Sequence, residues 1–210
     1  MSRHGEDGMT ANDGFAQIYA EDDVPWDIGK PQPPFVRIAD QVVGPVLDAG
    51  CGTGNTALHL AARGLEVTGI DFVEEALQRA REKAEKRGVA VTFLRKDAMT
   101  LGTWEARFAS VIDSGLFHVY HGAERRTYVA GLAHVTRPGG RLYLFAFSEE
   151  ELNPERGTSE AELRAVFADD WVVESIERAR GELNPAFVQK HPEAFPDGYT
   201  KMWFAVLRRR

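Results

Sequence analysis

Short apolar runs alternate with amphipathic stretches along most of this chain. The run GPVLDAG at residues 44–50 has the length and composition of a strand that is covered on both faces. The stretch VEEALQRAREKAEKRG at residues 73–88 instead has apolar residues at helical spacing and ends in a glycine, which is typical of a surface helix. The pattern therefore predicts strands and helices that alternate along the chain.

The same reading assigns the remaining elements. The predicted strands are residues 44–50, 65–71, 89–97, 108–115, 141–147, 171–179 and 201–209. The predicted helices are residues 35–43, 54–64, 73–88, 123–136 and 159–168, helical spacing also marks residues 15–26, and RPGG at residues 137–140 predicts a turn.

Strands that alternate with helices imply parallel β-α-β units. The last two predicted strands are joined by residues 179–200, which contain three prolines and no predicted helix, so we expect an antiparallel hairpin at one edge. The predicted fold class is α/β: a Rossmann-like, mostly parallel sheet of seven strands with an antiparallel last strand and helices on both faces.

Length and composition limit the organisation of the chain. The 210 residues, 43% of them hydrophobic, can bury one core and predict a single domain over residues 14–210. The polar residues 1–13 are expected to form a disordered tail. A net charge of -7 argues against a broad nucleic-acid-binding face.

Several other classes are excluded by what the sequence lacks. No stretch reaches the roughly 18 to 20 apolar residues of a membrane span, and the polar start differs from a secretory signal, so we expect a cytoplasmic protein. The one cysteine, Cys51, allows neither an internal disulfide nor a multi-cysteine metal site. Asp113, His118 and His121 are the one candidate metal cluster, but HVYH is more typical of a helix cap and a packed imidazole, and no metal is expected.

Candidate chemistry begins at the glycine loop, residues 50–54, which follows the first strand. Its spacing is G-x-G-x-G, whereas the dinucleotide fingerprint is G-x-G-x-x-G. A phosphate-binding P-loop needs a lysine and a hydroxyl residue after its last glycine, and Asn55 and Thr56 stand there instead. In an open α/β sheet the ligand lies beyond the carboxyl ends of the strands, so this loop marks the expected site.

Two carboxylates suggest what the loop holds. Asp71 ends the second strand, where its carboxylate can accept both hydroxyls of a ribose, as in an NAD or an adenosine cofactor. No tyrosine is followed four residues later by a lysine, the pair that a short-chain dehydrogenase needs. Asp97 ends the third strand, where it can accept a hydrogen bond from an adenine amino group. An adenosine without a pyrophosphate fits better than NAD, and an NAD-dependent oxidoreductase is the alternative.

Five segments in order carry a resemblance to a known family. They are VLDAGCGTG, VTGID, RKDAM, FASVIDSGLFHV and RPGGRLYLFAF, which lie within residues 46–147. This series resembles the motifs of class I S-adenosylmethionine (SAM)-dependent methyltransferases, whose product is S-adenosylhomocysteine. The resemblance implies a set of cofactor-binding residues: Trp26, Asp48, Gly50, Cys51, Gly52, Asp71, Phe72, Asp97, Ala98, Asp113 and Ser114. It implies that the glycine loop contacts the methionine part, Asp71 the ribose, Asp97, Ala98 and Phe72 the adenine, and the backbone at Asp113 and Ser114 the methionine amino group.

The segment before the first strand indicates the acceptor class. VPWDIGKPQPP at residues 24–34, the entrance segment, resembles PWD-(I/L)-G-x-x-x-P of the thiopurine methyltransferase-like group, which includes thiol and halide methyltransferases and bacterial enzymes that methylate small heterocyclic toxins. In that group the amino-terminal part folds over SAM and helps to close the acceptor pocket, so residues 14–45 are the expected cover. The resemblance would place Trp26 near the sulfonium, where a cation–π contact is worth ~0.5 to 2 kcal/mol. The Asn/Asp-Pro-Pro-aromatic sequence of amino-methylating DNA enzymes is replaced by DSGL.

The expected activity is methyl transfer to S, N or O of a small, aromatic or heterocyclic molecule, in detoxification or natural-product tailoring. A SAM-binding module without catalysis is the non-enzymatic alternative. His118 is the first candidate for a group that takes a proton from the acceptor, although a structural histidine fits equally well. The candidate substrate residues are Tyr19, Trp26, Lys30, His118 and Phe187. A small-molecule acceptor is the expected partner, without nucleic acid or membrane, and the chain is expected to be a monomer or homodimer.

Overall fold

A computed structural model of the chain describes residues 11–20, 24–150 and 157–210. Most of the predicted tail, residues 1–10, lies outside the described residues, and the first helix begins at Ala11. Within the described part of the chain, no helix is long and apolar enough to cross a membrane.

The elements alternate as the hydrophobic pattern predicts. The strands are β1 (Val46–Ala49), β2 (Val67–Asp71), β3 (Thr92–Arg95), β4 (Phe108–Ser114), β5 (Thr136–Phe147), β6 (Trp171–Glu182) and β7 (Tyr199–Arg209). The helices are α1 (Ala11–Ala20), α2 (Pro33–Arg37), α3 (Asn55–Ala61), α4 (Glu74–Arg87), α5 (Gly122–Val135), α6 (Glu160–Val166) and α7 (Pro185–Lys190). Short 3-10 turns are η1 (Ala39–Gln41), η2 (Ala98–Thr103) and η3 (Phe117–Val119).

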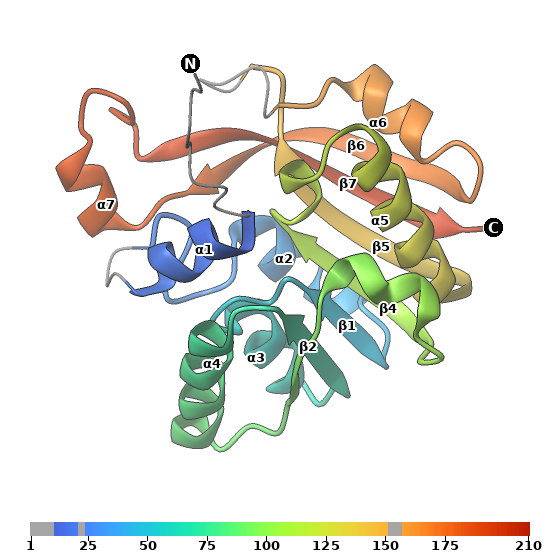
Figure 1. Ribbon diagram of the computed structural model, residues 1–210, viewed down its shortest axis with the longest axis horizontal. Coiled ribbons are helices and arrows are strands. Elements are labelled where there is room, and N and C mark those ends of the chain that lie inside the picture. Colours follow the sequence, from blue (N-terminus) through green and yellow to red (C-terminus); the bar gives the residue numbers. More distant parts are fainter. Residues whose placement is uncertain (1–10, 21–23, 151–156) are drawn as a thin grey trace, which may run out of the picture.

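The strands form one sheet in the order β3-β2-β1-β4-β5-β7-β6 (Figure 1). Neighbouring strands are parallel from β3 to β5, and β7 is antiparallel to both β5 and β6. This arrangement confirms the predicted fold class and the terminal hairpin, with β6 as the outer strand. The strand order reverses between β1 and β4, and the loops after these two strands form the crevice in which an open α/β sheet binds its ligand.

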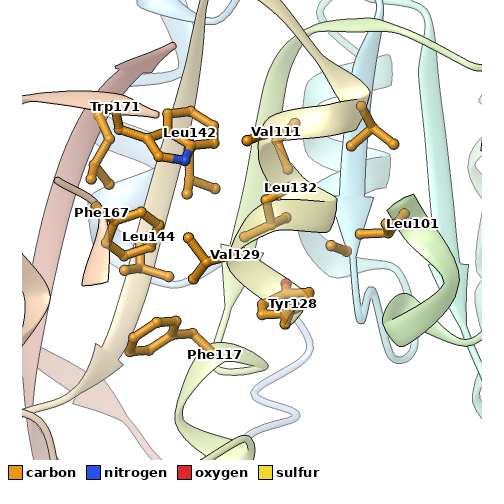
Figure 2. Close-up of a cluster of buried hydrophobic side chains, with 14 of the residues drawn as sticks. Leu101, Val111, Phe117, Tyr128, Val129, Leu132, Leu142, Leu144, Phe167 and Trp171 are labelled. Carbon is orange, nitrogen blue, oxygen red and sulfur yellow. The ribbon is translucent and has the colours of Figure 1, made fainter. Parts of the chain in front are cut away.

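The core has one layer on each face of the sheet, because side chains alternate along a strand. On one face, Leu142 and Leu144 of β5 pack in the cluster that contains Leu132 of α5, as Figure 2 shows. On the other face, Tyr143 and Phe145 belong to the cluster that contains residues of α2, α3 and α4. Both faces are therefore covered, which explains why the central parallel strands β1 and β4 are largely buried.

Two predicted segments differ from the structure. The helix predicted at residues 35–43 is split into α2 and η1, and the break falls at Ile38, where φ is -95° and ψ is 1°. This region is rich in β-branched residues, which are weak helix formers. The turn predicted at residues 137–140 lies inside β5 as an irregularity of the register, because Phe108 pairs with Thr136 while Ser110 already pairs with Arg141.

The connection between β6 and β7 contains a short helix that the sequence reading missed. Helix α7 has Pro185 at its first position, and the Asn184 side chain accepts a hydrogen bond from the backbone N–H of Ala186 at 2.9 Å. Both are ordinary signals of a helix start. Three prolines in the connection suggested a chain without helix, although proline is favoured at the first position of a helix, and Asn184 caps this one.

Candidate functional site

The glycine loop follows β1, and side chains from other parts of the protein pack closely against its glycines. Gly50, Gly52 and Gly54 have φ values of 68°, 52° and 78°, which favour glycine strongly. A Cβ atom on Gly50 would lie 2.9 Å from Leu116, and one on Gly54 would lie 2.8 Å from Phe93. Each of these glycines therefore provides both a backbone conformation and room for a neighbouring side chain.

Asp71, at the end of β2, binds the glycine loop directly. Its Oδ2 accepts a hydrogen bond from the backbone N–H of Gly52 at 2.9 Å, and its Oδ1 accepts one from that of Val73 at 3.0 Å. Burial raises the pKa of this carboxyl, and the backbone donors act in the opposite direction. Each carboxylate oxygen can accept a second hydrogen bond, so Asp71 retains capacity for ribose hydroxyls.

Two fully buried carboxyls lie at the ends of β1 and β4. Burial, followed by the charges of Asp113 and Asp71, raises the pKa of Asp48 to about 7. Among the described residues, Asp48 Oδ2 has no hydrogen-bond partner. Burial also raises the pKa of Asp113 to about 6. Because a buried polar atom is normally paired, the Asp48 carboxyl is suited to a polar or cationic group of a ligand.

The side chain of Asp113 fixes the turn that follows β4. Its Oδ1 accepts hydrogen bonds from the backbone N–H groups of Leu116 at 2.8 Å and Phe117 at 3.2 Å. Its Oδ2 accepts one from the Tyr128 hydroxyl at 2.8 Å. All of these hydrogen bonds of the Asp113 side chain are made within the protein. In the predicted binding scheme it is therefore the backbone at Asp113 and Ser114 that contacts the cofactor.

The remaining predicted cofactor residues lie in varied surroundings. Asp97 is exposed and caps η2 by accepting a hydrogen bond from Met99 N–H at 2.9 Å, and Ala98 after it is buried. Phe72 is half-buried and meets Phe15 of α1 edge to face, with ring centroids 6.1 Å apart.

The thiol of Cys51 packs within the protein. A Cβ atom on Gly69 of β2 would lie 2.9 Å from the Cys51 sulfur, so Gly69 makes room for this side chain. Burial raises the pKa of the thiol well above its usual value. These surroundings suit an inert, small residue in a tight turn.

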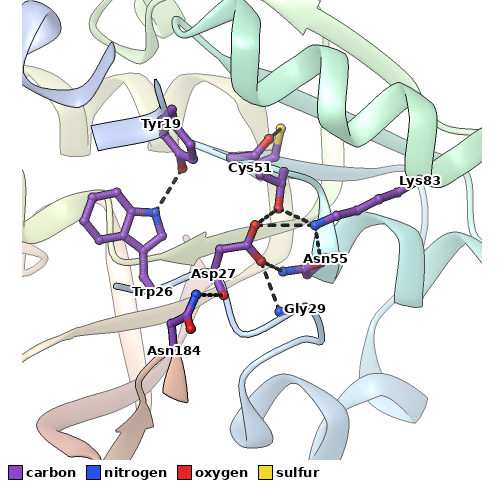
Figure 3. Close-up of polar contacts among 10 residues, drawn as sticks. Tyr19, Trp26, Asp27, Gly29, Cys51, Asn55, Lys83 and Asn184 are labelled. Carbon is purple, nitrogen blue, oxygen red and sulfur yellow. Dashed lines mark hydrogen bonds and ion pairs between the residues drawn. The ribbon is translucent and has the colours of Figure 1, made fainter. Parts of the chain in front are cut away.

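An aromatic pair from the predicted cover, shown in Figure 3, meets the glycine loop through Tyr19, whose hydroxyl lies 2.5 Å from where a Cβ atom on Gly52 would be. The indole Nε1 of Trp26 donates a hydrogen bond to the hydroxyl of Tyr19 at 3.0 Å. Tyr19 is 5% exposed and Trp26 is 39% exposed. Burial and then the charge of Asp71 raise the pKa of Tyr19, so this phenol stays protonated. Tyr19 and Trp26, which are both candidate substrate residues, are thus in direct contact.

A polar junction beside this pair was missed by the sequence reading. Asp27 accepts hydrogen bonds from the Thr53 hydroxyl at 2.6 Å and the Asn55 amide at 2.7 Å, and Lys83 of α4 contacts the Asp27 carboxylate at 3.4 Å (Figure 3). Lys83 also donates to Thr53 at 2.6 Å and to Asn55 at 3.0 Å. The available signal was Asp27 itself, the aspartate of the PWD sequence, for which no contact was predicted.

The candidate acceptor residues are spread more widely. The His118 ring stacks on Phe147, with centroids 3.9 Å apart, and its Nδ1 accepts a hydrogen bond from Phe147 N–H at 3.4 Å. Lys30 forms an ion pair with Glu182 at 2.7 Å and is 60% exposed. Phe187 lies on α7, with its ring centroid 5.7 Å from that of Phe195.

Comparison with known proteins identifies the family. Residues 46–140 match the family described as a methyltransferase domain. A protein of Mycobacteroides abscessus named 2-heptyl-1-hydroxyquinolin-4(1H)-one methyltransferase is 35% identical over 181 residues, which cover 83% of this chain and 77% of that protein. The chain is a class I SAM-dependent methyltransferase.

Solved structures have the same fold as this methyltransferase. The structure titled "Conversion of a Disulfide Bond into a Thioacetal Group during Echinomycin Biosynthesis" is 32% identical, with a TM-score of 0.82 and coverage of 95% of this chain and 92% of that chain. The N-methyltransferase NodS from Bradyrhizobium japonicum, solved with S-adenosylhomocysteine, is 17% identical, with a TM-score of 0.69 over 93% of this chain and 96% of that chain. At that identity the second similarity concerns the fold alone.

The cofactor of the methyltransferase is SAM. The family assignment decides between the two cofactors that the residues had left open, and the NAD-dependent oxidoreductase is rejected. The site fits this cofactor, because Asp48 has an unpaired buried oxygen, Asp71 retains acceptor capacity and the glycine loop presents backbone without side chains. SAM carries a sulfonium and an ammonium group, and buried carboxyls favour cations.

Proposed function

We propose that the methyltransferase transfers the methyl group of SAM to a sulfur, nitrogen or oxygen atom of a small aromatic or heterocyclic molecule, in detoxification or natural-product tailoring. The observation that carries this proposal is the Tyr19–Trp26 pair, because it joins an aromatic cover directly to the cofactor loop. The relative whose name gives a heptyl-hydroxyquinolinone as its substrate supports a flat heterocyclic acceptor. The PWD sequence supports membership of the thiopurine methyltransferase-like group.

The bound cofactor supplies an electrophilic methyl group on a sulfonium whose positive charge disappears on transfer. For this chain the task is to orient the two reactants and to exclude water, which together can account for most of the rate enhancement of such a displacement. We propose that Asp71 binds the ribose, that Asp97, Ala98 and Phe72 contact the adenine, and that Trp26 presents its ring to the positive charge. A cation–π contact of this kind contributes ~0.5 to 2 kcal/mol.

The methionine part of the cofactor is assigned to the loops after β1 and β4. The backbone of Gly50, Cys51 and Gly52 would contact it, and the backbone at Asp113 and Ser114 would bind its amino group. Asp48 supports this arrangement, because it belongs to β1 just before the loop and has an unpaired buried carboxyl oxygen. In this scheme the side chain of Asp113 acts through the turn that it holds.

His118 is proposed as a polar group beside the acceptor. Because Nδ1 accepts the Phe147 N–H, the neutral ring carries its proton on Nε2. In that tautomer the ring donates a hydrogen bond to an oxygen or sulfur atom of the methyl acceptor. Removal of a proton from the methyl acceptor requires the other tautomer. This favours acceptors that ionise readily, such as thiols with a pKa near 8.5 or acidic N-hydroxy heterocycles, over weakly acidic alcohols.

The cover and α7 are proposed to line the acceptor pocket. Tyr19 and Trp26 would contribute from the cofactor side and Phe187 from α7, and their rings suit a flat apolar ligand. Lys30 is the weaker candidate, since it forms an ion pair with Glu182 at the end of β6.

A mass-spectrometric screen tests the proposal. Purified methyltransferase and SAM are incubated with thiols, phenols, N-hydroxy heterocycles and heteroaromatic amines, and each product is examined for the gain of one methyl group. We expect transfer to at least one aromatic member, and its loss in the Asp71→Ala variant. Binding of S-adenosylhomocysteine without methylation of any panel member would overturn the small-acceptor proposal.

A further inference from the structure

The entrance segment, residues 24–34, is held at two sides by parts of the chain that are distant in sequence. On one side, the carboxylate of Asp27 reaches the end of the glycine loop and α4. On the other, its backbone and neighbouring side chains bind the corner where β6 ends and α7 begins. The segment therefore connects the glycine loop with α7, the helix that carries Phe187.

On the loop side, both carboxylate oxygens of Asp27 are used. Oδ2 accepts from Thr53 at 2.6 Å, and Oδ1 accepts from Asn55 at 2.7 Å and from the backbone of Gly29 at 3.1 Å. Burial alone would raise the pKa of Asp27, but Thr53 and the charge of Lys83 outweigh it, so the pKa is lowered. The carboxylate is therefore ionised and held in a single orientation.

On the α7 side, Asn184 makes two hydrogen bonds to the entrance segment. Its backbone N–H donates to the carbonyl of Pro25 at 2.8 Å, and its side-chain amide donates to the carbonyl of Asp27 at 3.2 Å (Figure 3). The same side chain caps α7 by accepting from Ala186 N–H. Next to it, Gln32 and Glu182 exchange two hydrogen bonds, of 2.9 and 2.8 Å. Asn184 thus joins Asp27 to the first turn of α7.

Stability alone does not account for this junction. Polar and charged groups that are partly removed from water contribute little net stability compared with apolar packing, but a fully satisfied network fixes one arrangement of the elements that it joins. Here the elements joined are the cofactor loop, α4, the entrance segment and α7. Figure 1 shows α1 and α7 on the same side of the molecule.

We propose that Asp27 is a positioning residue that couples the cofactor loop to the acceptor side, so that the bound cofactor orders the entrance segment and α7 before the acceptor binds. This inference rests on the proposed acceptor pocket between the cover and α7. A ligand on the glycine loop fixes Thr53 and Asn55, these fix Asp27, and Asp27 with Asn184 fixes the start of α7. Asp27 acts through these groups and does not touch the reacting atoms.

Hydrogen exchange of the whole protein, with and without saturating S-adenosylhomocysteine, tests the coupling. In the wild type we expect the ligand to slow exchange at least threefold both in the entrance segment and in α7. In Asp27→Asn, which loses the charge that faces Lys83, we expect the slowing in α7 to disappear at saturation. Asn184→Asp keeps the α7 cap and removes the donor to the Asp27 carbonyl, so we expect its affinity for S-adenosylhomocysteine by calorimetry to stay within twofold while α7 protection falls.

The matched control is Asp40→Asn, which removes an exposed carboxylate paired with Arg63 and should keep the wild-type response.

With an acceptor found by the screen, Asp27→Asn should raise the KM for the acceptor about tenfold with kcat changed less than twofold. A ligand that leaves α7 exchange unchanged in the wild type, or protects α7 equally in Asp27→Asn, would overturn the coupling. Exchange and calorimetry need no acceptor, so a failed methylation screen leaves this test decisive.

Discussion

The hydroxyl of Tyr19 lies 2.5 Å from the position that a Cβ atom on Gly52 would occupy. Helix α1 therefore meets the cofactor loop at a point where any side chain larger than glycine would collide with it. Gly52 also donates its N–H to Asp71, so a single loop residue contacts the cover on one side and, on the other, the carboxylate that is proposed to bind the ribose.

Gly52→Ala should destabilise the protein through two separate effects. The φ of 52° costs an alanine roughly 1 to 2 kcal/mol, and the collision with Tyr19 adds to that cost. Gly64→Ala is a matched control, because Gly64 has a φ of 85° but nothing within 4 Å of its Cβ position. Adding Tyr19→Phe to Gly52→Ala should recover part of the loss, with a coupling of ~0.5 to 3 kcal/mol in urea unfolding. Strictly additive effects would show that the two residues do not meet.

Asp71→Ala should weaken the binding of S-adenosylhomocysteine. The variant loses charge-assisted hydrogen bonds to the ribose, worth on the order of 1.5 to 3 kcal/mol, or roughly 10- to 150-fold in affinity. It also removes the partner of the Gly52 N–H, so a lower melting temperature is expected. Titration calorimetry measures the affinity, with Asp40→Ala as an exposed control. Unchanged affinity would contradict the assignment of Asp71.

Asp48→Asn should stabilise the protein at alkaline pH. The folded-state pKa of Asp48 is about 7, above the unfolded value of 3.8, so the folded state holds an extra proton between these values. The stability from this group is therefore complete below pH 3.8 and is lost as the pH rises through 7. One pKa unit corresponds to about 1.4 kcal/mol, so the variant should melt several degrees above the wild type at pH 8.

Calorimetric melting at pH 5 and pH 8 measures this difference. The gap between Asp48→Asn and the wild type should widen as the pH rises, because the amide does not ionise. The variant should also bind S-adenosylhomocysteine more weakly if the unpaired carboxyl oxygen faces the cationic part of the cofactor. A variant that melts below the wild type at pH 8 would show that the buried carboxylate is compensated in the folded protein.

His118→Gln and His118→Ala separate hydrogen-bond donation from proton removal. A glutamine amide can donate as Nε2–H does but cannot accept a proton, so the donor role predicts that His118→Gln retains most turnover and that His118→Ala loses roughly 10-fold or more. A base would make both variants equally poor with hydroxyl acceptors and spare thiols. Initial rates measured against pH for a series of substituted acceptors distinguish the two roles. If His118 is a donor, the pH at which the rate falls on the acid side should follow the pKa of each acceptor.

Local patterns in the sequence were sufficient to predict the arrangement of strands and helices. Strand and helix periodicities, together with the glycines after β1, predict the parallel sheet and the position of the site, because these features depend on residues a few positions apart. Asp71 was predicted as a ribose ligand in the same way, since it ends a strand that the pattern already defines. The predicted helix 35–43 and the missed α7 are errors of the same local kind, in β-branched and proline-rich sequence.

What the tertiary structure decided is which separated residues meet. Lys83 and Asp27 are 56 positions apart, and Asn184 and Asp27 are 157 positions apart. No periodicity or turn signal links residues at such separations, because their contact depends on how α4 and the β6–α7 corner pack against the entrance segment. The sequence by itself determined the fold and predicted a cofactor site at the carboxyl edge of the sheet, and the packing of the elements determined how the cover is joined to the glycine loop.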